Sequence, residues 1–226
     1  MKISDIRKSF DDFSLYVKEL DIPQGKIYGI IGPNGCGKTT LMKIAAGLIK
    51  PDSGYVNHGN LSISDITMVF RKPYLLHDTV IHNLTYPLKL RKIKPDRDLL
   101  EHYLEIAGLE NSRDKYAPGL SGGQQQKLAL IRAMIFSPKL AFFDESFSNL
   151  DMESAEVFER FLIERHQREP STFVVCAHQL SHIRRLCDYV FFMYEGRIEA
   201  HGSTDEILLQ PKNGRLQSYL KYASFN

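Results

Sequence analysis

The sequence has few cysteines, little net charge and no long hydrophobic run. Its three cysteines, Cys36, Cys176 and Cys187, include no C-x-x-C pair, which excludes a disulfide framework and a zinc site and suits a reducing compartment. A formal net charge of +2 is too small to favour nucleic acid as the main partner. Apolar runs such as 173–177 are far shorter than the roughly 18 residues that span a bilayer. Because charges also interrupt the first residues, we expect no signal peptide and a cytoplasmic protein whose membrane role depends on a partner.

Short apolar segments alternate with segments of helical periodicity along the chain. Strands are predicted at 2–7, 13–17, 26–31, 66–70, 140–143, 172–176 and 189–193, and a helix at 38–48. Several of these strands are apolar throughout, which is typical of a parallel sheet buried on both faces. Apolar residues recur at helical spacing between about 72 and 137. The sequence therefore predicts one α/β domain over 1–226, with a core at about 1–71 and 138–226 and a helical insert between.

A glycine-rich segment follows the predicted strand 26–31 and precedes the predicted helix. It matches G-x-x-x-x-G-K-[ST] and continues with one more threonine: Gly32, Pro33, Asn34, Gly35, Cys36, Gly37, Lys38, Thr39 and Thr40. The glycines permit positive φ, so successive backbone N–H groups can turn toward one anion at the start of the helix. We expect Lys38 to reach the β- and γ-phosphates of a nucleotide and the Thr39 hydroxyl to bind Mg²⁺.

Two carboxylates, Asp144 and Glu145, end the predicted strand 140–143. The carboxyl edge of a parallel sheet is where such folds bind ligands. We expect Asp144 to hold Mg²⁺ through water and Glu145 to take a proton from an attacking water. These features leave a kinase, a GTPase, a helicase or a transport ATPase open. No Asn precedes a Lys, so the guanine-reading Asn-Lys-x-Asp motif is absent from the sequence, which disfavours a GTPase.

The segment Leu120–Gln124, Leu-Ser-Gly-Gly-Gln, separates these possibilities. Ser121 suits a helix N-cap, and Gly122 and Gly123 leave backbone N–H groups open at the helix start. With Gln124, these residues therefore indicate a second phosphate-binding site. Together with the glycine-rich, phosphate-binding segment 32–40 and the acidic pair Asp144 and Glu145, it resembles the nucleotide-binding subunits of ABC transporters. The resemblance covers residues 3–209, and the motifs follow one another in the order found in the family. Three further features carry the resemblance: the D-loop-like segment 148–151 ending in Asp151, the switch-like His178, and Phe10 at the adenine-stacking position.

The resemblance implies a P-loop NTPase core with a mostly parallel sheet, an N-terminal antiparallel β part and a helical subdomain at about 72–137. It implies that ATP, with Mg²⁺, is bound between two head-to-tail copies and hydrolysed with Glu145 and His178 as catalytic residues. It also implies a membrane-spanning permease as partner, a solute-binding protein acting through that permease, and a peripheral position on the inner face of the cell membrane. No nucleic-acid partner is implied.

Arg71 stands where the family has a glutamine that helps hold Mg²⁺. Arginine has no acceptor atom, so Arg71 is expected either at the γ-phosphate or turned toward the permease. Ser146 replaces a common proline, which is a milder change. Cys36, at a helix start beside Lys38, is expected to be a reactive thiol when no nucleotide is bound.

The leading prediction is the ATPase of an importer of a small solute. Segment 68–76 faintly resembles tungstate and molybdate importers. Because little sequence follows residue 209, we expect no appended regulatory β-domain of the sugar-importer kind. The alternatives are a soluble ABC ATPase acting on a ribosome or DNA, an exporter subunit, and a non-hydrolysing subunit, which the intact Glu145 and His178 oppose.

Overall fold

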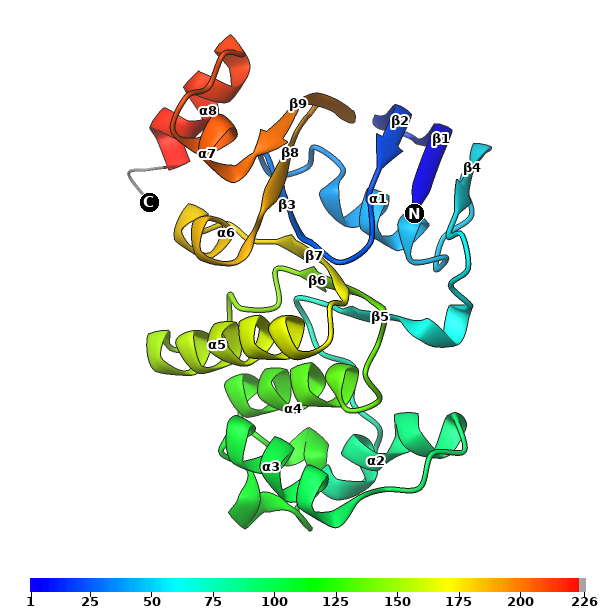
Figure 1. Cartoon of the computed structure of the whole chain (residues 1–226), viewed down its shortest axis with the longest axis vertical. Helices are drawn as coiled ribbons and strands as arrows, with labels where there is room; N and C mark the ends of the chain where they lie inside the picture. The colour runs from blue at the N-terminus through cyan, green and yellow to red at the C-terminus, as the bar shows by residue number, and fades with distance from the viewer. Residues whose placement is uncertain (224–226) are drawn as a thin grey trace.

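The computed structural model describes residues 1–223, which form two β-sheets with helices around the larger one (Figure 1). The smaller sheet is antiparallel, in the order β2-β1-β4, with β1 at Lys2–Phe10, β2 at Phe13–Asp21 and β4 at Ser53–Asn57. The larger sheet has the order β5-β6-β7-β3-β8-β9 and is parallel except for β9. Its strands are β3 Ile27–Ile31, β5 Ile66–Val69, β6 Leu140–Asp144, β7 Thr172–Cys176, β8 Tyr189–Tyr194 and β9 Arg197–Ser203. The predicted α/β class and N-terminal antiparallel part are confirmed.

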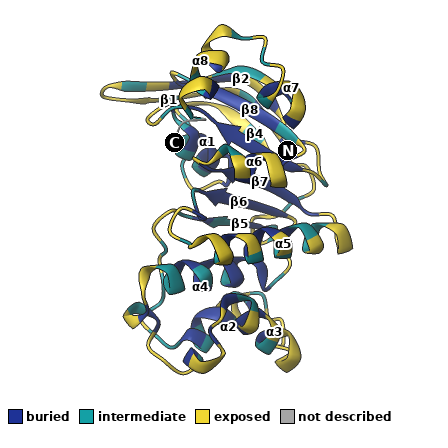
Figure 2. Ribbon diagram, turned by 90° about the vertical axis from the view of Figure 1, so that its left-hand side faces the viewer, coloured by how far each residue is buried: buried dark blue, intermediate teal, exposed yellow. Residues whose placement is uncertain are grey.

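The two faces of the larger sheet bury separate cores, because successive side chains of a strand point to opposite faces. Along β3, Tyr28 and Ile30 pack with α1 (Lys38–Ala45) and the antiparallel sheet, whereas Ile27 and Ile31 pack with the other helices. Burial on both faces explains why these strands are apolar throughout. Figure 2 shows the buried strands running through the middle of the molecule.

The regular elements between β5 and β6 are helical, and this stretch lies at the bottom of Figure 1. They are α2 (Val80–Leu90), α3 (Arg97–Ala107) and α4 (Gly122–Met134), with short 3₁₀ turns at Glu110–Ser112 and Ala117–Gly119. Leu84, Leu104 and Leu128, one from each helix, are fully buried in the same core. We propose residues 72–137 as a helical subdomain on this basis. The other helices are α5 (Met152–Arg168), α6 (Leu180–Leu186), α7 (Thr204–Leu208) and α8 (Gly214–Ala223), and a 3₁₀ turn at Ile63–Asp65 precedes β5.

Some predicted boundaries were wrong. The helix predicted at 38–48 ends at Ala45, because Gly47 adopts a φ of 75° that a right-handed helix does not accommodate. The strands β4 and β9 were not predicted, since both are edge strands whose side chains are mostly half-buried or exposed. None of the helices in residues 1–223 is long and apolar enough to cross a membrane.

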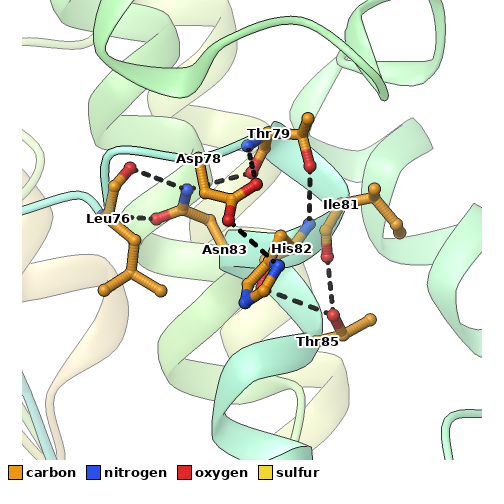
Figure 3. A network of polar contacts seen from close by, with 7 residues as sticks. All are labelled: Leu76, Asp78, Thr79, Ile81, His82, Asn83 and Thr85. Carbon is orange, nitrogen blue, oxygen red and sulfur yellow. Dashed lines mark hydrogen bonds and ion pairs between the residues drawn. The ribbon is translucent and has the colours of Figure 1, made fainter.

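A polar network fastens the loop after β5 to the start of α2 (Figure 3). Thr79 caps the helix by accepting a hydrogen bond from the backbone N–H of His82, whose ring lies 3.2 Å from the Asp78 carboxylate. The buried Asn83 amide donates to the carbonyls of Leu76 and Thr79 and accepts from the Leu76 N–H. The end of this loop is therefore held to the helix by side-chain hydrogen bonds.

Three segments meet at the carboxyl ends of the parallel strands in the larger sheet. β3, β7 and β6 run parallel as neighbours, with Ile30 and Asp144 both paired to Cys176. The residues that follow these strands accordingly emerge side by side: the glycine-rich segment after β3, Glu145 after β6, and His178 shortly after β7.

Candidate nucleotide-binding and hydrolysis site

The glycine-rich segment turns tightly between β3 and α1. Gly32 has a φ of 149°, and a Cβ there would lie 2.1 Å from the Met193 carbonyl oxygen, so no side chain fits. Gly37, the N-cap of α1, has a φ of 100° and lies against the Phe13 ring. Lys38 is buried, and its ammonium donates to the carbonyls of Gly32 (2.7 Å) and Pro33 (2.9 Å). The segment thus brings backbone N–H groups, a helix N-terminus and a cation together, which suits a polyphosphate.

Thr39 and Asp144 come together from α1 and β6. The Thr39 hydroxyl donates to Asp144 Oδ1 at 3.0 Å. Burial raises the pKa of the Asp144 carboxyl, and the hydrogen bond from Thr39 partly offsets this. Hydroxyl and carboxylate oxygens are ligands that Mg²⁺ accepts, and the cation would favour the ionised carboxylate. This donor pair fits the predicted Mg²⁺ site.

Glu145 lies between two cationic or potentially cationic side chains. His178 Nε2 is 2.8 Å from Glu145 Oε1, and Arg71 Nη1 is 3.1 Å from Oε2. The Glu145 backbone has a φ of 49°, a strained conformation for a residue with a side chain, and its N–H donates to the Cys176 carbonyl. The predicted pair Glu145 and His178 is brought together, whereas the contact of Arg71 with Glu145 was not predicted.

The segment Ser121–Gln124 begins α4 with a capping box. The Ser121 N–H donates to Gln124 Oε1 at 3.1 Å, and the Gln124 N–H donates to Ser121 Oγ at 3.4 Å. Nothing lies within 4 Å of a Cβ built on Gly122, so the backbone is open on that side. In Figures 1 and 2, α4 and α1 lie on opposite sides of β5 and β6. One chain therefore does not bring this helix start to its own phosphate-binding segment.

Asp151 caps α5, the helix that follows Glu145. Its carboxylate accepts from the N–H and the hydroxyl of Ser154, and the first of these bonds most strongly lowers the pKa of Asp151. Just before it, the Asn149 side-chain amide donates to the Arg71 carbonyl at 3.1 Å. The segment 148–151 is thereby joined to the loop that carries Arg71.

Phe10 lies at the end of β1 and is 48% exposed. Its ring stacks on Phe13 with centroids 6.4 Å apart, and the Phe13 ring contacts Gly37. Phe13 therefore links Phe10 to the phosphate-binding segment.

The expected reactivity of Cys36 was wrong. Its side chain is 4% exposed, and burial raises the pKa of the thiol despite the nearby Lys38 ammonium. The thiolate is the reactive form of a cysteine. Burial of Cys36 disfavours the thiolate more strongly than the Lys38 charge favours it.

A glycine-rich phosphate-binding turn, an acidic strand end and a parallel sheet define a P-loop NTPase. Comparisons with known proteins narrow this class. The model of the ABC transporter family matches residues 17–148. The chain is 37% identical over 208 residues to the tungstate uptake system ATP-binding protein TupC of Peptoclostridium acidaminophilum, which covers 88% of this chain and 97% of that protein. It is 33% identical to the spermidine/putrescine import ATP-binding protein PotA of Fusobacterium nucleatum subsp. nucleatum, covering 100% of this chain and 63% of the relative.

A solved structure is also similar, the dimeric post-hydrolysis state of an ATP-binding cassette bound to ADP and Pi. It has a TM-score of 0.79 and 25% identity, and the match covers 90% of this chain and 98% of that one. This chain belongs to the ABC transporter family, and it is an ATPase.

Proposed function

We propose that two copies of the chain close around ATP and hydrolyse it at their interface. This closure of the two copies drives a separate membrane permease. The observation that supports it most strongly is the convergence, at one sheet edge, of the phosphate-binding segment, Asp144, Glu145 and His178. We infer that one γ-phosphate bound there would lie within reach of a phosphate cradle, a metal-binding pair and a general base.

In the proposed mechanism Glu145 accepts the proton of the attacking water. His178, 2.8 Å from Glu145, holds the carboxylate and donates toward the water or the γ-phosphate. Lys38 turns from the carbonyls of Gly32 and Pro33 to the β- and γ-phosphates, where its charge opposes the charge that develops in the transition state.

Mg²⁺ is part of the proposal, and Thr39 and Asp144 are the residues that would hold it. When bound, the cation neutralises phosphate charge during transfer. Residues 32–40 bind the phosphates through backbone N–H groups, and Phe10 offers its exposed ring to adenine.

The second copy supplies what one chain lacks. Because α4 begins on the other side of the sheet from α1, Ser121, Gly122, Gly123 and Gln124 of one copy are proposed to meet the γ-phosphate bound by the other, with Asp151 at the same interface. A head-to-tail pair with two-fold symmetry completes both sites at once.

We propose that the permease binds the chain at the inner face of the cell membrane and that a solute-binding protein delivers the cargo to the permease. The oxyanion tungstate is the proposed cargo. Support comes from the tungstate uptake relative, which this chain matches over 97% of its length.

Glu145→Gln tests the hydrolytic site. The amide keeps the shape but does not accept the proton, so we expect ATP binding to remain, turnover to fall at least 100-fold, and an ATP-bound dimer to persist in size-exclusion chromatography with Mg-ATP. Glu153→Gln, an exposed acid on α5, is the matched control and should retain wild-type turnover. A Glu145→Gln protein that is monomeric and fully active would remove Glu145 from its role.

The cargo is tested in the assembled complex. Purified permease, binding protein and this subunit, reconstituted in liposomes, should show ATP turnover stimulated by tungstate and less by sulfate. Equal turnover with and without tungstate would contradict the proposed cargo and leave the hydrolytic site untouched.

A further inference from the structure

We propose that Arg71 is a positioning residue that holds Glu145 in an ion pair and slows hydrolysis until its guanidinium moves off the carboxylate. The proposal rests on the proposed role of Glu145 as general base. It assigns to Arg71 a contact different from either of the two expected from the sequence.

Strand register places the two residues side by side. β5 and β6 are parallel neighbours with Val69 paired to Phe143, and Arg71 and Glu145 each lie two residues beyond this pair. The Arg71 backbone is held there because its carbonyl accepts a hydrogen bond from the Asn149 amide at 3.1 Å. The sheet and this hydrogen bond therefore hold the backbones of the two residues near each other.

Both carboxylate oxygens of Glu145 face a nitrogen. Oε1 faces His178 Nε2 at 2.8 Å, and Oε2 faces Arg71 Nη1 at 3.1 Å in a side chain that is only 12% exposed. A general base must present an oxygen to the water whose proton it takes. Glu145 Oε2 is buried with Arg71 against it, so we infer that water reaches this oxygen only after a neighbour withdraws.

Arg71 is the neighbour that is able to withdraw. Its side chain is 64% exposed, against 39% for His178. Glu145 Oε2 accepts no hydrogen bond from any residue in 1–223, so the contact with Arg71 is an ion pair without the geometry of a hydrogen bond. An ion pair with one exposed partner is weak, which makes release easy.

An ATP phosphate is a competing anion for the same guanidinium. A crevice of about 520 Å³ is lined by Arg71 together with Thr39 and Asp144, the proposed metal-binding residues. Arginine pairs with phosphate as readily as with carboxylate. With the nucleotide bound, the guanidinium would exchange between the γ-phosphate and Glu145, so that the base is free for only part of the time and release of the ion pair precedes each hydrolysis step.

The test is steady-state ATP turnover by the full chain with Mg²⁺, measured for three variants. In Arg71→Gln we expect kcat to rise two- to fivefold, the range of a weak ion pair at 1.36 kcal/mol per tenfold, while KM for ATP changes less than twofold. Arg71→Lys keeps a cation in reach of Glu145 and should stay near the wild-type kcat. Lys94→Gln removes an exposed charge that does not line this crevice and should leave kcat unchanged.

Three results would overturn the proposal: an unchanged kcat in Arg71→Gln, a lower kcat, or a KM raised tenfold, which would make Arg71 mainly a phosphate ligand rather than a partner of Glu145. A nucleotide-free thermal-unfolding cycle of Arg71→Gln, Glu145→Gln and the double variant gives a second readout. We expect a measurable coupling between the two sites, and additivity would count against the ion pair. If Glu145→Gln alone keeps full turnover, the proposed function fails. If Glu145→Gln is inactive and Arg71→Gln is unchanged, only the role of Arg71 fails.

Discussion

Asn83→Ala should remove the polar connection between the loop after β5 and the helical subdomain. Asn83 is fully buried, and its side-chain amide forms hydrogen bonds with Leu76 and Thr79 (Figure 3). It also accepts a hydrogen bond from Arg132. Arg132 comes from α4 and also donates to the Tyr74 carbonyl, so the amide joins α2, α4 and the loop. Alanine supplies none of these hydrogen bonds and leaves the half-buried Leu76 N–H without its partner, whereas the Leu76 carbonyl keeps the Asp78 N–H.

The magnitude follows from the bonds lost. Removing Asn83 breaks the two hydrogen bonds with Leu76 and one each with Thr79 and Arg132. At about 1 kcal/mol for each bond, with more where a buried group stays unpaired, the free energy of unfolding should fall by roughly 3–4 kcal/mol. For a chain of this size that is a drop of about 10 °C in Tm.

The assay is thermal unfolding by circular dichroism, with Thr85→Val as the control on the same helix. The Thr85 hydroxyl donates to the Ile81 carbonyl at 2.9 Å, and its near-isosteric loss should lower Tm by about 3 °C or less. Binding of a fluorescent ATP analogue should survive in Asn83→Ala, because α1 lies on the other face of the sheet. A fall in Tm no larger than that of the control would refute the assigned role of the Asn83 network.

Three further outcomes follow from buried ionisable groups. Burial raises the pKa of the Cys36 thiol, so at pH 7 a maleimide should label it at less than a tenth of the rate after denaturation, as measured by intact mass; equal rates would contradict this. Burial also raises the pKa of Asp144, so the contribution of this carboxyl to stability is present at low pH and is lost as pH rises. Asp144→Asn should therefore raise the nucleotide-free Tm at pH 7 while abolishing Mg²⁺-dependent turnover. A lower Tm in Asp144→Asn would contradict this. Burial opposes ionisation of Glu159, but hydrogen bonds from His182 and Arg185 outweigh it and hold the pKa of Glu159 below its usual value. That stability is present above pH 4.5, the usual value, and is lost as pH falls further, so the Tm difference between Glu159→Gln and wild type at pH 7 should vanish toward pH 3.

Much of the candidate site could be predicted because its signals are local and each follows a strand. The phosphate-binding segment, Asp144 and His178 are each defined by a few residues after an apolar segment. Parallel strands then place their carboxyl ends at one edge without further information. The edge strands β4 and β9 escaped prediction because solvent covers much of their side chains, so apolar alternation is weak.

Cys36 shows where local reasoning fails. A helix N-terminus and a neighbouring lysine both favour a thiolate, and both are present in the structure. What the sequence does not reveal is that the side chain points into the core beside the Gly32 turn, where burial outweighs the local charges.

Arg71 shows the same limit at the level of the sheet. From the sequence, its lack of an acceptor excluded metal binding but did not identify its partner. That partner follows from the pairing of β5 with β6, two strands separated in the chain by the whole helical stretch. Val69 pairs with Phe143, and the Arg71 and Glu145 side chains contact each other just beyond the two strands. A glutamine at 71 would place an uncharged amide where the structure has an ion pair. If Glu145 is the general base, as proposed, the substitution acts on it from the neighbouring strand, and its effect should appear in kcat rather than in nucleotide affinity.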